Sequence, residues 1–171
     1  MNTARAYEWG KSKEGVQAAR RFMDRPRIIE SRLTLLFARM DQLRDRVEPV
    51  VLGQALVHGS FAGDKTGHLA AQLCDLEYEA EKLLHELTVL RKLRQEILDA
   101  LPDNEAGRAV SLVCLENLTQ VAAARRMYMD ERQFARRFRQ GLELVATHLK
   151  MREEEYPEVS PVRIPNENKG A

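Results

Sequence analysis

The chain has 171 residues and a formal net charge of +1, with 44% apolar, 31% charged and only 6% aromatic residues. This balance is typical of long helices and argues against a β-sandwich or barrel. The sequence has no run of about 18 apolar residues and no basic-then-apolar leader, so we expect a cytoplasmic protein that does not enter the membrane.

The N-terminal quarter of the chain predicts one amphipathic helix. Residues 1–25 are polar and mixed, with Trp9 and Phe22 as large anchors, and Asp24 followed by Pro26 has the form of a helix start. Apolar residues then follow the alternating four-three spacing of a coiled-coil seam: Ile29, Leu33, Leu36, Met40, Leu43 and Val47. We expect this helix to stop near Pro49, before a glycine-rich loop over residues 50–67.

A second heptad series predicts a longer helix. Its apolar positions, interrupted only by Arg94, are Leu69, Leu73, Leu76, Ala80, Leu83, Leu87, Leu90, Ile97 and Leu101. A helix over residues 67–100 would be about 50 Å long and needs a partner helix. The first seam can supply it as an antiparallel hairpin, or a second copy of the chain can, and the pattern does not decide between them. Because the second series has more apolar positions than the first, we expect a surplus that pairs between chains in a homo-oligomer.

The residues after Leu101 predict a three-helix module over residues 102–150. Pro102 and Asp103 end the long helix and start another, and Asn117 stands where a helix end can turn left-handed. The apolar stripe of this helix consists of Ala106, Val110, Val113, Cys114, Leu115 and Leu118. Residues 151–171 carry an acidic run and three prolines, and we expect a flexible tail there.

Residues 119–145 predict two helices joined by a four-residue turn, the pattern of a DNA-reading helix-turn-helix. Thr119 caps the first helix and Asp130 the second, while Tyr128 stands in the turn, where glycine is common. One face of the second helix is apolar through Phe134, Phe138, Leu142 and Val145. The side chains predicted to meet DNA are Thr119, Gln120, Arg125, Arg126, Glu131, Arg132, Gln133, Arg136, Arg137, Arg139 and Gln140.

Charge placement favours the same interpretation. Residues 119–150 hold seven Lys/Arg against three Asp/Glu, whereas residues 66–105 hold four against nine. A basic module beside an acidic one suits a protein that presents one surface to phosphates, and arginine can grip a phosphate or a guanine edge at two points. The alternative is a coiled-coil interaction protein whose basic helix docks an acidic protein partner such as RNA polymerase.

No constellation of residues predicts an enzyme, a metal site or a cofactor. The GDKTG stretch at residues 63–67 lacks the Gly-Lys-Ser/Thr order of a phosphate-binding loop, and His85-Glu86 is followed by Val89 where a second metal ligand is needed. Cys74 and Cys114 lie in helical apolar patterns, so we expect reduced, buried thiols at both positions.

The order of these segments resembles the ArpU/RinA-type phage transcriptional regulators, whose C-terminal module is similar to the promoter-reading domain of sigma factors. The resemblance covers roughly residues 69–149 and rests on Ile97, Leu98, Leu101, Pro102 and Asp103, then Leu118 with Thr119, Ala124, residues 130–134 and Leu142. It implies a phage- or prophage-encoded DNA-binding regulator of late genes, acting at the nucleoid of a bacterial host.

The sequence therefore predicts an all-α protein. A helical, coiled-coil-like scaffold over residues 1–101 is followed by a helix-turn-helix module over residues 102–150 and the tail. We expect double-stranded DNA as its ligand, with host RNA polymerase as a second candidate partner.

Overall fold

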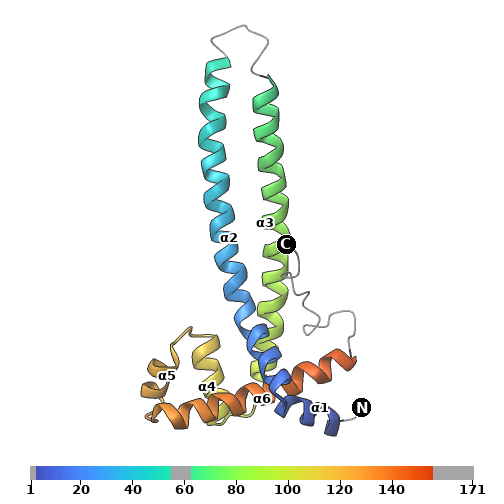
Figure 1. Ribbon diagram of the computed structural model, residues 1–171, viewed down its shortest axis with the longest axis vertical. Helices are drawn as coiled ribbons and strands as arrows, with labels where there is room; N and C mark the ends of the chain where they lie inside the picture. The colour runs from blue at the N-terminus through green and yellow to red at the C-terminus, as the bar shows by residue number, and fades with distance from the viewer. Residues whose placement is uncertain (1–2, 55–62, 156–171) are drawn as a thin grey trace. The chain divides into compact units, whose positions relative to one another are not determined.

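The computed structural model describes residues 3–54 and 63–155, and this part of the chain contains six α-helices and no strand (Figure 1). The helices are α1 (Thr3–Lys11), α2 (Lys13–Gln54), α3 (Gly63–Asp99), α4 (Glu105–Cys114), α5 (Gln120–Arg126) and α6 (Glu131–Glu155). The predicted all-α class is confirmed. No helix within the described residues is long and apolar enough to cross a membrane.

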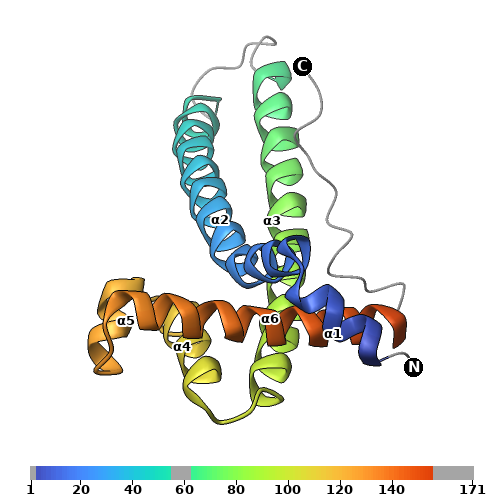
Figure 2. The same ribbon diagram turned by 60° about the horizontal axis from the view of Figure 1, so that its bottom comes forward.

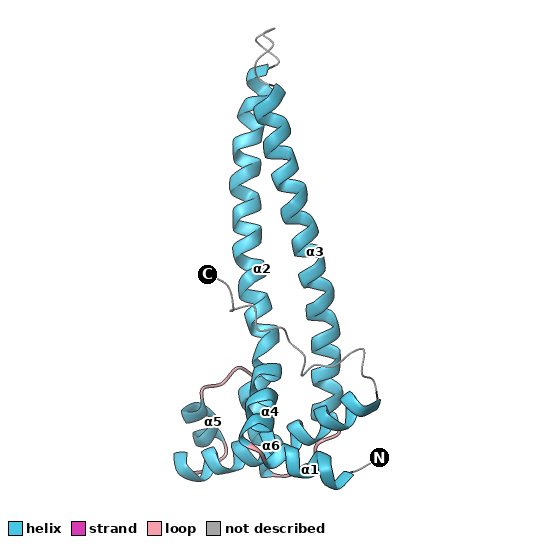
Figure 3. Cartoon of the chain, turned by 45° about the vertical axis from the view of Figure 1, so that its right-hand side comes forward, coloured by secondary structure: helices cyan, strands magenta, loops and turns pink. Residues whose placement is uncertain are grey.

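Residues 26–91 form one of two compact units, an antiparallel hairpin of α2 and α3 (Figures 1 and 3). Its core is the predicted seam: Ile29, Leu33, Leu36, Met40 and Leu43 of α2, with Leu76, Ala80, Leu83 and Leu87 of α3 buried and Leu69, Leu73 and Leu90 packed at its margins. Ion pairs join the helices on both sides of this core. The two heptad series are confirmed except at Val47, whose side chain lies outside the described part of the structure, and they pair within one chain.

The end of the second heptad series packs into the other unit, residues 1–25 with 92–171. Ile97 and Leu101 are buried there, with 1% and 8% of their surface exposed. Arg94 is half-buried, and its Nη1 donates to the carbonyl of Cys114 at 3.3 Å. All nine apolar positions of the series are thus buried or half-buried within one chain, and pairing of the surface left exposed at the half-buried positions with a second copy stays a prediction.

The prolines do not bound α2 as expected. The helix begins at Lys13 rather than near Pro26, and it continues through Pro49 to Gln54. A proline in a helix interior removes one backbone donor and costs about 3 kcal/mol, but its fixed φ is helical. Near Pro26 the packing of Phe22 and Met23, 1% and 2% exposed, offsets this cost. Buried apolar surface therefore overrides the local signal.

The glycine-rich loop and the tail are shorter than predicted. Helix α3 begins at Gly63, and α6 extends to Glu155, five residues into the expected tail. A glycine inside a helix costs only roughly 0.5–1 kcal/mol, so Gly53 and Gly67 weaken the helices without ending them. The remainder of the expected loop, residues 55–62, and of the tail, residues 156–171, lies outside the described residues.

The second unit combines the N-terminal 25 residues with residues 92–171. Helix α1 packs along α6 (Figure 2). Ala6 and Gly10 lie in this contact region and are buried, and a Cβ on Gly10 would stand 2.7 Å from the carbonyl oxygen of Glu143. The close approach of α1 to α6 therefore depends on small side chains, which contribute little to a hydrophobic pattern.

The two cysteines differ in their surroundings. Cys114 is buried as predicted, and removal from water raises the pKa of its thiol to about 12. Cys74 is exposed, so its predicted burial is wrong. It directly follows the seam residue Leu73 and faces away from the seam, because consecutive residues of a helix point about 100° apart.

Candidate nucleic-acid interface

Helices α4, α5 and α6 pack on one another at the predicted site. Asn104 caps α4, since its Oδ1 accepts from the backbone N–H groups of Ala106 and Gly107, each at 3.0 Å. Gly141 lets α6 cross α4 closely, because a Cβ there would stand 2.5 Å from the carbonyl oxygen of Ala106. Asn117 has the expected left-handed conformation, with φ 53°. These features fix the support on which α5 and α6 rest.

Helix α5 begins as predicted. The Thr119 hydroxyl accepts from the backbone N–H of Ala122 at 3.2 Å and so caps the helix. Ala123 and Ala124 are fully buried, and their small side chains let α5 pack closely within the unit. The connection to α6 is the expected four-residue turn, residues 127–130.

The turn places Tyr128 in an unusual position. The backbone N–H groups of Met127 and Met129 donate to the carbonyls of Ala123 and Ala124, each at 3.0 Å. Between them Tyr128 has φ 56°, the left-handed conformation in which glycine is favoured, and 98% of its surface is exposed. Neither buried contacts nor the left-handed backbone conformation explains a tyrosine at this position. Sequence reasoning noted its place in the turn but did not include it among the binding residues.

Helix α6 is held by its apolar face. The Asp130 carboxylate accepts from the backbone N–H of Gln133 at 2.8 Å and caps the helix. The predicted core residues Phe134, Phe138, Leu142 and Val145 are all buried. The rings of the two phenylalanines stack with centroids 6.2 Å apart and planes at 10°. The opposite face of α6 is therefore presented outward in a fixed orientation.

Every residue predicted to meet DNA is exposed. These side chains lie on α5, on its capping residue and on the first three turns of α6: Thr119, Gln120, Arg125, Arg126, Glu131, Arg132, Gln133, Arg136, Arg137, Arg139 and Gln140. They differ in whether their charges are already paired.

Three of the arginines contact carboxylates of their own chain. Arg137 Nε lies 2.8 Å from Glu105 Oε2, and Arg139 Nε lies 3.3 Å from Glu143 Oε1. Arg126 pairs with Glu116. Exposed pairs of this kind contribute about 0–1 kcal/mol to stability and can exchange for another anion at little cost.

Arg125, Arg132 and Arg136 have no carboxylate partner among the residues that the structure describes. Arg136 also lines a shallow hollow of about 420 Å³ with Glu105, Met129, Gln133, Arg137 and Gln140. Guanidinium groups beside side-chain amides can bind phosphate oxygens or the acceptor edge of a base. Within the described part of the chain, the arginines of α6 without a carboxylate partner, Arg132 and Arg136, therefore lie near the start of that helix.

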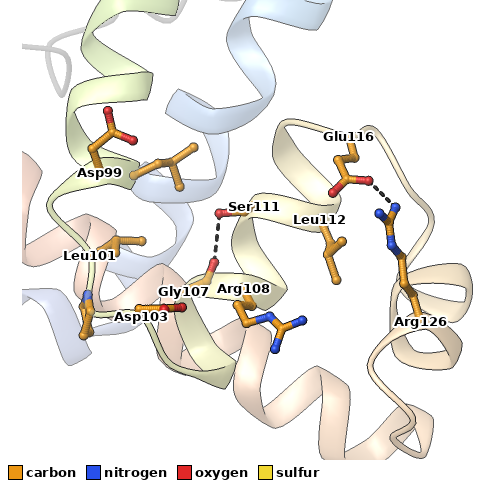
Figure 4. A pocket seen from close by; sticks show the side chains of 11 residues that line it. Asp99, Leu101, Asp103, Gly107, Arg108, Ser111, Leu112, Glu116 and Arg126 are labelled. Carbon is orange, nitrogen blue, oxygen red and sulfur yellow. Dashed lines mark hydrogen bonds and ion pairs between the residues drawn. The ribbon is translucent and has the colours of Figure 1, made fainter.

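A second hollow, of about 400 Å³, lies beside α4 (Figure 4). The Arg126–Glu116 pair stands on one side of it, and the Ser111 hydroxyl donates to the Gly107 carbonyl at 3.1 Å. Arg108 also lines it and is exposed, a cation that sequence reasoning did not single out. Nowhere in the described part of the chain do three His, Cys, Asp or Glu side chains gather to hold a metal.

Comparison with known proteins gave no match: no family model, no curated protein and no solved structure matches this chain.

Proposed function

We propose that this chain is a sequence-specific DNA-binding transcriptional regulator in which α5 and α6 form a helix-turn-helix. In this proposal α6 enters the major groove and α5 lies across the phosphate backbone. Arg132 and Arg136 contact base edges or phosphates, and Arg125 and Tyr128 contact the backbone beside them.

One observation carries the proposal. Helix α6 presents Arg132 and Arg136, which have no carboxylate partner among the described residues, from a face opposite its buried phenylalanines. A cation that lacks an internal partner gains most from a phosphate, because each such contact releases condensed counterions. A rigidly seated helix also loses little conformational freedom on binding. The likeness to ArpU/RinA-type regulators suggests late phage genes as the targets.

The proposal is tested by selecting duplexes from a random pool with the full-length protein. We expect a shared motif to be enriched, and an unlabelled duplex with that motif to compete far better than a shuffled duplex of the same composition. Equal competition by both duplexes would show that binding is only electrostatic and would contradict sequence-specific reading.

A second candidate function is a scaffold whose basic helix docks an acidic protein surface, with RNA polymerase as a candidate partner. The pairs of Arg126, Arg137 and Arg139 with carboxylates favour it, because they show that this surface accommodates acidic side chains. An acidic protein partner that binds α6 while no duplex does so would establish this alternative.

A further inference from the structure

One side of the hairpin carries two ion pairs that join α2 to α3, and Asp41 adds a further contact to one of them, with its Oδ1 3.8 Å from Arg44 Nη1. Arg91 Nη2 lies 2.7 Å from Glu30 Oε1, and Arg44 Nη2 lies 3.1 Å from Glu77 Oε1. In each helix the two charged residues are two heptads apart, so they share a side and stand about 21 Å from each other. Each helix thus contributes one acid and one base to the two pairs, and each ion pair joins opposite charges across the two helices.

Apolar groups lie between the two ion pairs. Phe37 and Leu84 are each one heptad from both charged residues of their own helix, and 43% and 45% of their surfaces are exposed. Next to them, the hydroxyls of Thr34 and Thr88 donate to the backbone carbonyls of Glu30 and Leu84 at 3.0 and 2.9 Å. Both threonine hydroxyls would therefore keep a hydrogen bond if this centre were covered by a partner. We call these eight residues the Phe37 surface: Glu30, Thr34, Phe37, Arg44, Glu77, Leu84, Thr88 and Arg91.

The charges of the Phe37 surface are complementary to themselves. Negative and positive groups alternate around its four corners. A two-fold axis in the plane of contact between two copies exchanges either the ends of the hairpin or its two helices. If the ends are exchanged, Glu30 meets the second copy's Arg44, and Glu77 meets the second copy's Arg91. Every corner then faces its opposite charge, and Phe37 faces its own counterpart.

The other side of the hairpin is complementary to itself only if the two helices, and not the ends, are exchanged. There Arg32 and Arg39 stand one heptad apart on α2, and Glu79 and Glu86 one heptad apart on α3. Arg32 pairs with Glu79 at 2.5 Å. At these four positions α2 carries only arginine and α3 only glutamate, so exchanging the ends would set arginine against arginine.

We propose that the Phe37 surface binds a second copy of the chain, with the hairpins antiparallel and the two Phe37 rings at the centre. Flanking charges of helical hairpins set partner choice and orientation, while the apolar centre supplies the contact that excludes water. The contact lies outside the α5–α6 surface and does not depend on DNA binding.

The first test is the mass of the full-length protein by sedimentation, without DNA. We expect a dimer for the wild type and a monomer for Phe37→Glu at the same concentration. The matched control is Leu35→Glu, which places the same charge at a neighbouring position of α2 whose side chain is 72% exposed. Circular dichroism checks that both variants remain helical. A wild-type protein that is still monomeric at about 100 µM would overturn the proposal, because its dissociation constant would be far weaker than that of most stable dimers. A dimer of the Phe37→Glu variant would overturn it as well.

The second test keeps both ion pairs that join α2 to α3 and changes the contact between copies. Within the chain it removes only the exposed contact of Arg44 with Asp41, 3.8 Å apart. Exchanging Arg44→Glu with Glu77→Arg preserves the internal pair but sets like charges opposite each other in the antiparallel dimer, so we expect a monomer. Adding Glu30→Arg with Arg91→Glu restores all complementary contacts, and the dimer should return. A dimer that survives the first exchange, or one that the second exchange does not restore, would contradict the proposed arrangement.

Discussion

Replacing Tyr128 by glycine separates the needs of the turn from those of the proposed DNA contact. The left-handed conformation costs a residue with a Cβ about 1–2 kcal/mol, and glycine avoids this cost. Glycine also loses roughly 0.5–1 kcal/mol more conformational entropy on folding. Because the Tyr128 side chain is 98% exposed, the substitution removes almost no buried surface. We therefore expect Tyr128→Gly to stabilise the protein by about 0.5–1 kcal/mol.

Thermal unfolding followed by circular dichroism measures this effect. For a chain of this size 1 kcal/mol corresponds to roughly 2–4 °C in Tm. Binding to the selected duplex should weaken at the same time. A hydroxyl that donates to a phosphate contributes about 1.5–3 kcal/mol, so Tyr128→Phe should already lose about tenfold or more in affinity.

Opposite effects on stability and binding are the expected signature. If Tyr128→Gly lowers Tm, the turn depends on the side chain in a way that its exposure does not show. If both variants bind the duplex like the wild type, Tyr128 does not contact DNA and the proposed position of the turn on the backbone is wrong.

Three further predictions concern the remainder of the fold. Gly141→Ala should destabilise the protein by about 1–3 kcal/mol through overpacking, because the added Cβ would stand 2.5 Å from a carbonyl oxygen of α4. The control is Gly67→Ala, whose Cβ would have nothing within 4 Å and which should stabilise α3 in the same denaturant titration. Equal effects of the two variants would show that α4 and α6 can separate freely. Burial, and secondarily the charge of Arg152, lowers the pKa of His148 below 6.5. The unfolded chain therefore binds a proton at this position more readily than the folded one, so the free energy of unfolding should fall as the pH drops through about 6.5. An identical pH profile of stability for His148→Gln would contradict this. A thiol reagent should label the native protein once, at Cys74, and the unfolded protein twice, because Cys114 is buried with a pKa raised to about 12; rapid native labelling of Cys114 would show that α4 opens.

The sequence was sufficient where a repeating pattern and the core coincide. Sequence patterns predicted the heptads of α2 and α3, the caps at Thr119 and Asp130, and the buried face from Phe134 to Val145. Residues that are buried at a fixed period appear in the sequence as apolar residues at that spacing. The same reasoning placed the eleven exposed side chains of the α5–α6 surface.

The remainder depends on contacts between residues distant in sequence. Pro26 suggested a helix start because the packing that carries α2 through it is tertiary. Ala6 and Gly10 carry no hydrophobic signal, so the packing of α1 on α6 was not predicted. The sequence also could not explain why Arg94 interrupts the apolar series of α3. Its partner is the backbone carbonyl of Cys114, and every residue has such a carbonyl. Nor could sequence show which arginines already have carboxylate partners.

The most direct test of the proposed function is the affinity of the Arg132→Ala, Arg136→Ala double variant for the selected duplex across a range of salt concentrations. If both side chains contact phosphates, the slope of log K against log salt should fall by about 2, since each contact contributes about 0.9; a contact to a base should instead cost about 1–3 kcal/mol and relax specificity at that position. The control is Arg39→Ala with Arg46→Ala, which removes the same charge from exposed positions of α2. We predict that the α6 variant loses specific binding while the control keeps it. Unchanged binding by a folded Arg132→Ala, Arg136→Ala protein, or equal losses in both variants, would contradict recognition of DNA by α6.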